Sequence, residues 1–385
     1  MQQDEQWMAR AFALAYRGRF TATPNPNVGC VIVRDGQVVG EGYHRQAGEP
    51  HAEINALRQA GERARRATVY VTLEPCCHQG RTAPCTDALI AAGISRLVVS
   101  MQDPDPRVCG RGFWQLQQAG IEVEQGLMLE DAEALNRGFL KRMRTGFPWL
   151  RLKIAASLDG RTALASGESK WITSPEARSD VQALRAECCA ILTTSATVLA
   201  DDPALNVRWA ELDAATVALY PRRDANNPLA AEYDAQGSLR QPVRIILDSR
   251  NRVTPAHRVI HGPGACWLAR LSRDNNRWPD NTEQLLLPKS AAGVDLVLLL
   301  MQLAKRQINS VLVEAGAQLA GALLSAGLVD ELILYLAPRL LGDSARPLCL
   351  LPPLSRLAQA PEFVISEVRQ TGPDLRLRLK MGGSL

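Results

Sequence analysis

The stretch His51-Ala52-Glu53, followed by Pro75-Cys76 and then by Cys85, decides the fold and the chemistry of the first part of the chain. One imidazole and two thiolates are typical ligands of Zn²⁺, and three protein ligands leave the fourth position open to water. The ion lowers the pKa of that water toward neutrality. Glu53 follows His51 at an offset that suits a general acid and base beside the metal. The residues therefore predict a hydrolytic deaminase with one Zn²⁺ per chain, held by His51, Cys76 and Cys85.

The signature of zinc-dependent base deaminases is H-x-E followed by P-C-x-x-C, and this chain departs from it only in the last spacing. The segment between Cys76 and Cys85 is longer and contains Cys77, His78 and Arg81. An imidazole and a guanidinium beside an open metal site suit a substrate with a polar ring and a phosphate. The alternative is a structural zinc site closed by Cys77 or His78, which we disfavour because it leaves Glu53 without a use.

Composition excludes several classes of protein. The chain has 385 residues, 46% of them hydrophobic, which is enough for two domains with separate cores. Its formal charge is +4 without a run of Lys or Arg, so we expect no nucleic-acid partner. Nine scattered cysteines give no disulfide framework. The longest apolar run, 296–301, is too short to cross a bilayer, and the first residues lack a signal pattern. We therefore expect a soluble cytoplasmic enzyme that binds no membrane.

Periodicity in the first part of the chain indicates alternating helices and strands. Because two of the expected helices begin at zinc ligands, we predict an α/β/α layer structure with both of these helices on one side of a sheet. The expected helices are 5–17, 52–60 and 85–92, and the expected strands are 28–33, 38–42, 68–73 and 97–100.

Further motifs surround the zinc pattern: Thr23-Pro24-Asn25-Pro26, Gly42-Tyr43-His44 and Leu73-Glu74-Pro75-Cys76. Over about residues 5–145 they resemble the deaminase half of the bifunctional riboflavin-biosynthesis deaminase/reductase family. The resemblance implies a cytidine-deaminase-like domain at 1–146. It also implies a first substrate, a diaminopyrimidinone ribosylamine phosphate, that is deaminated at C2.

Four residues are candidates for binding this substrate. The amide of Asn25 can donate to and accept from a pyrimidine edge, although Asn between prolines also commonly stabilises a turn, and both roles remain open. The candidates for the sugar phosphate are His44, His78 and Arg81.

Thr145-Gly146-Phe147-Pro148 interrupts the pattern and predicts the boundary between two domains. Beyond it we expect strands at 149–155, 190–194 and 311–314, and a helix to about 188 with Ser174 as its N-cap and Pro175 in its first position. The strand at 311–314 runs through Gly316 into a helix, an arrangement that can seat an anion but that also occurs in plain crossovers. The spacing of glycines does not fit the dinucleotide fingerprint of a standard Rossmann domain.

Lys153, the segment 157–160 and the segments around Asp248 and Glu314 resemble the dihydrofolate-reductase-like reductase half of the same family. The match covers about residues 147–208 and 242–345. It implies an α/β reductase domain at 147–385 with a surface insertion at about 209–241, NADPH as cofactor, and a homodimer formed through this domain. The second reaction would be hydride addition that converts the ribosylamine to a ribitylamine.

The resemblance also implies the residues of the second site. Lys153, Asp201 and Glu314 are candidates for assisting the reduction, and Ser249 with Arg252 for the 2′-phosphate of NADPH, although Asp248 could instead serve a ribose diol. The implied NADPH contacts are Ala155, Trp171, Thr197, Asp201, Ser249, Gly316, Ala317, Gln318, Leu319, Ala320, Gly321 and Ala322. The implied substrate contacts are Ser169, Arg185, Leu205, Arg208 and Glu314.

Two functions of another class compete with this one. The zinc half could be a scaffold beside an active reductase, or the protein could deaminate bases in nucleic acid. A nucleic-acid enzyme needs aromatic stacking platforms and basic stripes, whereas aromatic residues make up only 5% of this chain.

Overall fold

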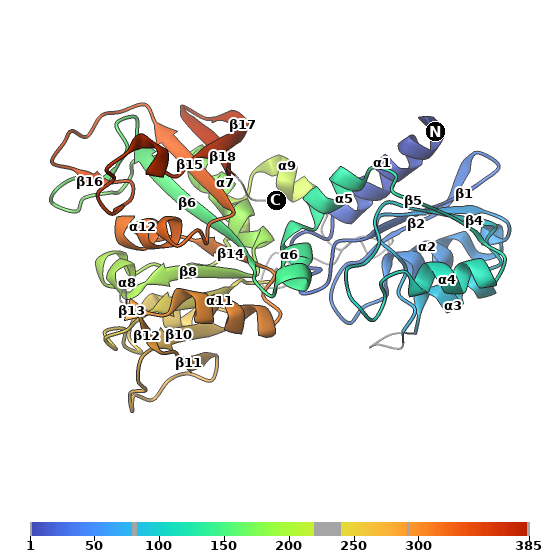
Figure 1. Ribbon diagram of the computed structural model, residues 1–385, viewed down its shortest axis with the longest axis horizontal. Helices are drawn as coiled ribbons and strands as arrows, with labels where there is room; N and C mark the ends of the chain where they lie inside the picture. Colours follow the sequence, from blue (N-terminus) through green and yellow to red (C-terminus); the bar gives the residue numbers. More distant parts are fainter. Residues whose placement is uncertain (1, 79–82, 219–239, 291–292, 383–385) are drawn as a thin grey trace. The chain divides into compact units, whose positions relative to one another are not determined.

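The residues before Gly146 form one large sheet and the residues after it form another. Gly146 follows the helix at residues 137–145 and has the left-handed backbone conformation, with φ 74°. The computed structural model describes residues 2–78, 83–218, 240–290 and 293–382. The chain divides into two units, each with its own sheet (Figure 1). Within the described residues the border between them falls between Gly146 and Phe147. Glycine adopts this backbone conformation without steric cost, and Pro148 two residues later prevents the helix from continuing.

The first unit is built on a five-stranded sheet in the order β2-β1-β3-β4-β5. β1 pairs antiparallel with β2 and β3, whereas β3, β4 and β5 are parallel. The strands are β1 Gly29–Arg34, β2 Gln37–Tyr43, β3 Thr68–Val71, β4 Arg96–Val99 and β5 Glu122–Gln125. The helices are α1 Gln2–Tyr16, α2 Ala52–Ala60, α3 Cys85–Ala91, α4 Arg111–Gln118, α5 Leu129–Leu135 and α6 Arg137–Thr145, with a short 3-10 turn η1 at Gly61–Ala64.

Helices cover both faces of this sheet. Apolar residues of α2, α3 and α4 pack with one another and with one face of β1, β3 and β4. Met8 and Ala11 of α1 pack on the opposite face, against Val31, Tyr70 and Val98. The predicted α/β/α arrangement, with both zinc-bearing helices on one side, is confirmed. α4, β5 and α5 were not predicted from the sequence.

A close contact fixes the start of α2 against β2. A Cβ atom on Gly42 would lie 2.3 Å from the carbonyl oxygen of Ala52, so only glycine allows the strand and the helix to approach this closely. His51, the residue before α2, is thereby held at the edge of the sheet.

The second unit is built on a nine-stranded sheet in the order β11-β10-β9-β8-β14-β6-β15-β18-β17. Its strands are parallel except for β18, which runs antiparallel to β15 and β17. They are β6 Trp149–Ser157, β8 Ala190–Thr194, β9 Val243–Leu247, β10 Cys266–Arg270, β11 Thr282–Leu286, β14 Ser310–Val313, β15 Glu331–Ala337, β17 Phe363–Thr371 and β18 Asp374–Met381. Two small ribbons pair β7 Arg161–Ala163 with β16 Arg346–Pro347, and β12 Lys289–Ser290 with β13 Gly293–Val294.

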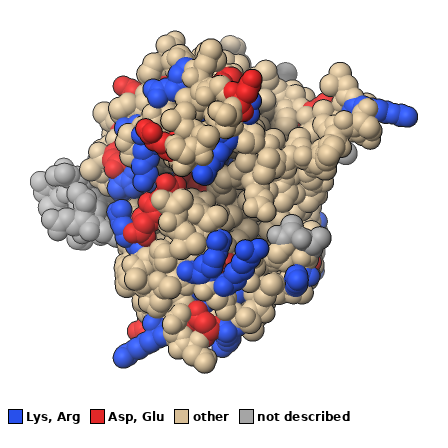
Figure 2. Space-filling model, turned by 90° about the vertical axis from the view of Figure 1, so that its left-hand side faces the viewer, with Lys and Arg blue, Asp and Glu red and all other residues tan. Residues whose placement is uncertain are grey.

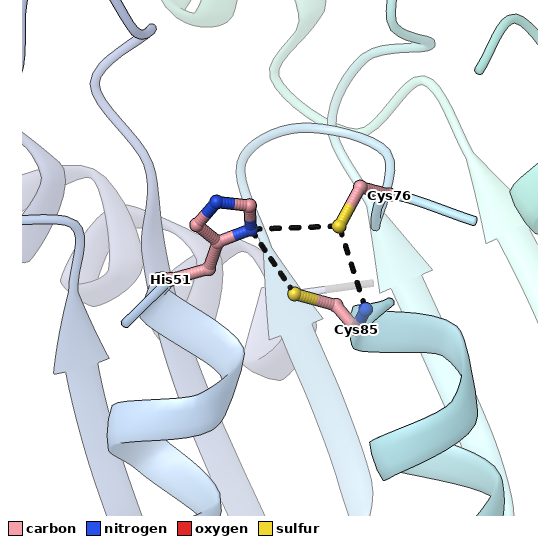
Figure 3. Close-up of side chains that lie close together, drawn as sticks. All are labelled: His51, Cys76 and Cys85. Carbon is pink, nitrogen blue, oxygen red and sulfur yellow. Dashed lines mark hydrogen bonds between the residues drawn. The ribbon is translucent and has the colours of Figure 1, made fainter. Parts of the chain in front are cut away.

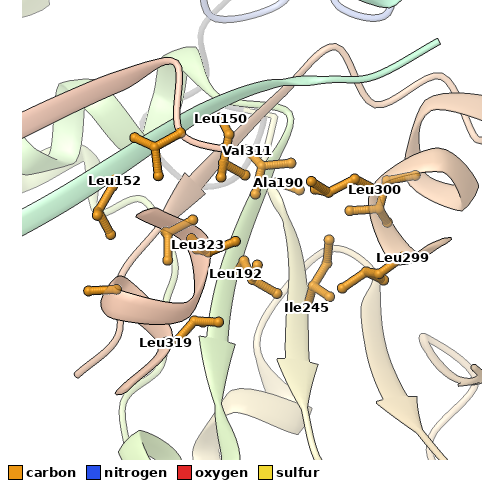
Figure 4. Close-up of a cluster of buried hydrophobic side chains, with 14 of the residues drawn as sticks. Leu150, Leu152, Ala190, Leu192, Ile245, Leu299, Leu300, Val311, Leu319 and Leu323 are labelled. Atoms are coloured by element: carbon orange, nitrogen blue, oxygen red, sulfur yellow. The ribbon is translucent and has the colours of Figure 1, made fainter. Parts of the chain in front are cut away.

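Helices cover both faces of the second sheet as well. α11 and α12 pack on one face through Leu299, Leu300, Leu319 and Leu323 (Figure 4). α7, α8 and α10 pack on the other face. The helical elements are α7 Pro175–Glu187, α8 Ser195–Asp201, α9 Ala214–Ala218, α10 Arg258–His261, α11 Leu296–Lys305 and α12 Ala317–Ser325, with 3-10 turns η2 Trp209–Glu211 and η3 Leu357–Gln359.

Several details of this unit match the sequence-based expectations. The Ser174 hydroxyl accepts a hydrogen bond from the Ala177 N–H at 3.2 Å, as expected of an N-cap, and Pro175 opens α7. β8 spans the predicted residues. Of the predicted insertion at 209–241, residues 219–239 lie outside the described part of the chain. Within the described part, no helix is long and apolar enough to cross a membrane.

Candidate functional site

The three predicted zinc ligands lie together (Figure 3). His51 immediately precedes α2, Cys85 is the first residue of α3, and Cys76 lies on the loop that follows β3. Nδ1 of His51 is 3.3 Å from Sγ of Cys85 and 3.5 Å from Sγ of Cys76, and the three ligand atoms lie within 4.8 Å of one another. In a tetrahedral zinc site with ordinary bond lengths, a nitrogen and a sulfur ligand are about 3.6 Å apart. The spacing of these side chains therefore fits a zinc ion.

The environment of Cys76 favours its thiolate. Its Sγ accepts a hydrogen bond from the backbone N–H of Cys85 at 3.4 Å, at the N-terminal end of α3. Hydrogen bonds from Cys85 and His51 lower the pKa of Cys76 to about 4. Zinc binds the deprotonated sulfur, so the fold prepares this ligand for the metal.

Glu53 lies in the first turn of α2 and is only 3% exposed. Burial raises the pKa of this carboxyl group to about 7. Its Oε2 has no hydrogen-bond partner among the described residues. A buried polar atom without a partner is rare in native proteins and indicates a site for a ligand or a reacting group.

Asn25 and His44 contact each other beside the zinc ligands. The Asn25 Nδ2 lies 3.0 Å from His44 Nε2, and the His44 ring packs edge-on against the His51 ring with centroids 5.3 Å apart. His44 is 3% exposed, and its Nδ1 lies 3.3 Å from the Pro50 carbonyl oxygen. Both ring nitrogens thus face protein groups. The expected contact of His44 with a sugar phosphate is not supported, and its position suits holding Asn25.

The loop after Cys76 contains the other predicted substrate residues. The Nδ1 atom of His78 is buried and has no hydrogen-bond partner in the described part of the chain, so it is available to a ligand. Cys77 points away from the ligand cluster, with Sγ 3.8 Å from the Arg107 carbonyl oxygen. Arg81 lies outside the described residues.

Sequence reasoning missed two residues that support this site. Asn136, 4% exposed, accepts from the Asn27 N–H at 2.8 Å and donates to the Asn27 carbonyl at 2.9 Å, which fixes the backbone two residues beyond Asn25. Glu74, also 3% exposed, accepts backbone hydrogen bonds from the loop before α4. No spacing pattern marks such long-range contacts, although Glu74 stands within the Leu73–Cys76 motif.

In the second unit, Lys153, Arg185 and Glu314 come together from three elements. Arg185 of α7 donates to both carboxylate oxygens of Glu314, at 2.6 and 2.9 Å. β14 and β6 pair with Val313 opposite Leu152, which places Glu314 next to Lys153. Burial lowers the pKa of Lys153, and the nearby Glu314 carboxylate opposes this shift. The three ionisable groups therefore form one largely buried cluster.

The carboxyl ends of the parallel strands bring the predicted cofactor residues to one edge of the sheet. α8 follows β8 with Thr197, Ser249 follows β9, and Gly316 follows β14. A Cβ atom on Gly316 would meet no atom within 4 Å, so the start of α12 is open. Ligands of α/β sheets bind at such edges, and the free N–H groups of a helix start attract phosphate.

The other residues of the predicted cofactor turn, 317–322, differ in their exposure. Ala317 and Gln318 are accessible, whereas Leu319, Ala320 and Gly321 are buried. The backbone of Leu350 crosses Gly321, where a Cβ atom would lie 1.8 Å from its carbonyl oxygen. Packing therefore accounts for Ala320 and Gly321. Ala322, within α12, is partly exposed.

The structure also shows the surroundings of three further groups of residues predicted for the second site. Leu205 is 3% exposed and packs in the core, which does not support a substrate contact. Asp201 lies at the surface 3.8 Å from Lys170, which does not support a catalytic role beside Lys153. Both predicted arginines donate to a carboxylate, Arg185 to Glu314 and Arg208 to Glu211. Arg208 is exposed whereas Arg185 is largely buried, so Arg208 is the more accessible of the two to a phosphate.

Trp171 remains a surface platform, 62% exposed, with the Arg178 guanidinium 4.6 Å from its ring centroid. Ser169 is partly exposed two residues before it, and Ala155 is partly exposed on β6. All three residues are accessible to a ligand, and their contacts with cofactor and substrate stay predictions.

Asp248 is completely buried, and its carboxylate is saturated. It accepts from Nε and Nη2 of Arg270 and from the backbone N–H groups of Arg252 and Val253. It therefore has no capacity for a ribose diol. Arg252 is exposed and donates to the Ser195 hydroxyl at 3.0 Å, so its guanidinium lies at the start of α8.

The face shown in Figure 2 carries basic and acidic side chains close to one another, without a continuous stripe of one sign. A nucleic-acid surface requires such a stripe. This face is thus consistent with the balanced charge of the chain.

Fold and site together define a zinc-dependent deaminase unit followed by an α/β reductase unit. Residues 1–101 match the cytidine and deoxycytidylate deaminase zinc-binding region, and residues 148–377 match the RibD C-terminal domain. The riboflavin biosynthesis protein RibD of Escherichia coli is 64% identical over 98% of this chain and 99% of that protein. The chain belongs to the RibD family of bifunctional riboflavin-biosynthesis proteins.

Solved structures support the same assignment over the full length. RibD from Acinetobacter baumannii matches with a TM-score of 0.86 and 45% identity, over 99% of each chain. A diaminohydroxyphosphoribosylaminopyrimidine deaminase/5-amino-6-(5-phosphoribosylamino)uracil reductase from Thermotoga maritima matches with a TM-score of 0.84 and 30% identity, also over 99% of each chain. The expected fold class, a cytidine-deaminase-like domain followed by a dihydrofolate-reductase-like domain, is confirmed.

Proposed function

We propose that this chain carries out two successive reactions on one phosphorylated pyrimidine. The first is hydrolytic deamination of a diaminohydroxyphosphoribosylaminopyrimidine, and the second is NADPH-dependent reduction of the resulting phosphoribosylaminouracil. The names of these substrates come from the Thermotoga maritima relative. The observation that carries the proposal is the zinc triad beside Glu53, whose Oε2 is buried and has no partner among the described residues.

In the first reaction, a zinc ion held by His51, Cys76 and Cys85 would supply a water of lowered pKa. Glu53 takes a proton and later delivers protons to the departing amine, for which a carboxyl pKa near 7 is well suited. Asn25 binds the pyrimidine edge through its carbonyl oxygen, because its amide nitrogen faces His44. His78 binds the polar part of the substrate through Nδ1, which has no hydrogen-bond partner among the described residues.

In the second reaction, the nicotinamide supplies the hydride. The bidentate ion pair between Arg185 and Glu314 holds these two charged side chains in a fixed position within the site. Lys153, beside this pair and with a lowered pKa, donates the proton that balances hydride addition to the opened imine. Gly316 and the first N–H groups of α12 hold the cofactor pyrophosphate.

We also propose a homodimer formed through the reductase unit and a cytoplasmic location. Val364, Ile365 and Val368 of the edge strand β17 are each more than half exposed, an apolar surface suited to a second copy. The structure describes all nine cysteines, and none of them forms a disulfide with another described cysteine, as expected in a reducing compartment.

Replacement of Glu53 tests the proposal. In Glu53→Gln the shape is kept but the proton acceptor is lost, so deamination should fall ~10²–10⁴-fold while zinc remains bound. Reduction of supplied deaminated substrate should continue at the wild-type rate. Equal loss of both activities in the folded variant would contradict two independent sites, and full deamination would remove Glu53 from the mechanism.

A further inference from the structure

We propose that Glu74 is a positioning residue for the Cys76 ligand. It holds Cys76 in place because its side chain accepts hydrogen bonds from backbone N–H groups at the start of α4. Glu74 stands two residues before Cys76 and is 3% exposed. It takes no part in the chemistry described above. The inference rests on the zinc site of the proposed function and concerns how this chain keeps that site rigid.

The carboxylate of Glu74 accepts three backbone hydrogen bonds. Oε2 accepts from the N–H of Asp103 at 3.2 Å and of Gly110 at 3.0 Å, and Oε1 accepts from the N–H of Gly112 at 3.0 Å. The backbone N–H of Glu74 donates to the Met101 carbonyl at 2.9 Å. Side chain and backbone of one residue thus fasten the turn before Cys76 to the loop that leads into α4.

The charge of Glu74 suits this position. Gly110, the residue that precedes α4, has no side chain to satisfy the first N–H groups of the helix. Glu74 supplies the missing acceptor, and a carboxylate at a helix start is stabilised by the helix dipole. A carboxylate can accept at both oxygens, whereas an amide can accept at only one. The site therefore requires Glu rather than Gln.

α4 also contacts the segment of the other cysteine ligand. Gln115 of α4 accepts from the Thr86 hydroxyl at 2.9 Å and donates to Asp87 at 2.7 Å, immediately after Cys85. Thr86 in turn donates its backbone N–H to the Cys76 carbonyl at 3.2 Å. α4 is therefore joined by hydrogen bonds to the segments that carry both thiolate ligands, and Glu74 makes the buried part of these contacts. We call this set of contacts the brace.

The start of α4 also packs closely against the turn that carries Cys76. A Cβ atom on Gly112 would lie 2.5 Å from the carbonyl oxygen of Pro75, the residue between Glu74 and Cys76. The start of α4 therefore contacts the ligand-bearing turn directly. A change in the Glu74 side chain will move Cys76 relative to His51 and Cys85.

The test measures metal retention in the zinc-loaded full chain. Glu74→Gln should release zinc to a chelator at least ~10-fold faster than the wild type, the scale expected for loss of a group that orients a ligand. With Co²⁺ in place of zinc, its d–d absorption should change in shape. Reduction by the second unit should be unaffected, and a cooperative thermal transition of the first unit like that of the wild type checks that this unit is folded.

Asp4→Asn is the matched control, because Asp4 is a partly buried carboxylate of the same unit that accepts from Arg96 and Tyr70, away from the metal. It should lower thermal stability without changing zinc release. Equal zinc release from Glu74→Gln and wild type, or equal acceleration in both variants, would overturn the positioning role. If Glu74→Gln does not fold, Gln115→Ala replaces it. Faster zinc release from that variant supports the brace, and an unchanged rate overturns it. A wild type that binds no zinc would instead refute the proposed function.

Discussion

The Asn25 amide and the His44 ring fix each other's orientation, with Nδ2 3.0 Å from Nε2. Burial lowers the pKa of His44 to about 4, so the ring is neutral at pH 7. Its Nδ1 faces the Pro50 carbonyl at 3.3 Å and must carry the hydrogen, which leaves Nε2 as the acceptor. Asn25 therefore donates to His44 and keeps its Oδ1 for the substrate.

Asn25→Asp should disrupt this arrangement. A carboxylate cannot donate to Nε2, so the side chain turns or the ring gains a proton, and the acceptor for the substrate is misplaced. We expect kcat/KM of deamination to fall about 10²-fold. Zinc content, measured by atomic emission, should not change. Unimpaired deamination would show that Asn25 serves only the turn between the two prolines.

Metal binding should depend on Cys85 and not on Cys77. Cys85 is buried within the ligand cluster, whereas Sγ of Cys77 faces the Arg107 carbonyl. Cys85→Ser should therefore lose zinc and deamination, while Cys77→Ser keeps about one zinc per chain. Metal analysis of both purified variants decides between an open and a closed site. Complete loss of zinc from Cys77→Ser would favour the closed structural site.

The cofactor preference should depend on Arg252. Since Asp248 accepts from Arg270 and two backbone N–H groups, the exposed guanidinium of Arg252 at the start of α8 is the group suited to a 2′-phosphate. Arg252→Ala should weaken NADPH binding about 10-fold or more and leave NADH binding nearly unchanged, as measured by fluorescence titration. The neighbouring exposed Arg250→Ala is the control. If NADH binds the wild type as tightly as NADPH does, the assignment of NADPH is wrong.

Acid should weaken the attachment of α1 to the first sheet. Hydrogen bonds from Arg96 and Tyr70 lower the pKa of Asp4 to about 2, below its value in the unfolded chain. The stabilisation is therefore present above about pH 4 and is lost as the pH falls toward 2. We expect about 1 kcal/mol in the free energy of unfolding, since solvent screens this pair. Asp4→Asn should remove this part of the pH dependence in denaturant titrations, and an unchanged acid profile would contradict it.

The sequence predicted the elements that carry local patterns. The zinc triad, the helix at 52–60 and the N-cap Ser174 each follow from residues close together in the chain, and the structure agrees. The burial of Leu205 and His44 could not be predicted because burial is a property of the whole fold, and their substrate contacts stay predictions. The Arg185–Glu314 pair and the Asn27–Asn136 contact join residues more than a hundred positions apart. No local period predicts such contacts.

The most direct test of two sites in one chain is the mass of the pyrimidine after incubation with the protein. Without NADPH, the wild type should raise the mass of the diaminopyrimidine by about 1 Da, as an amine becomes a carbonyl. With NADPH, the mass should rise by about 2 Da more through hydride and proton addition. Gly316→Val, which places a side chain in the open cofactor seat, should yield only the first product. Glu53→Gln should leave the diaminopyrimidine undeaminated and still reduce the supplied uracil. Formation of the deaminated and reduced product from the diaminopyrimidine by Glu53→Gln, or no change of mass with the wild type, would contradict the account.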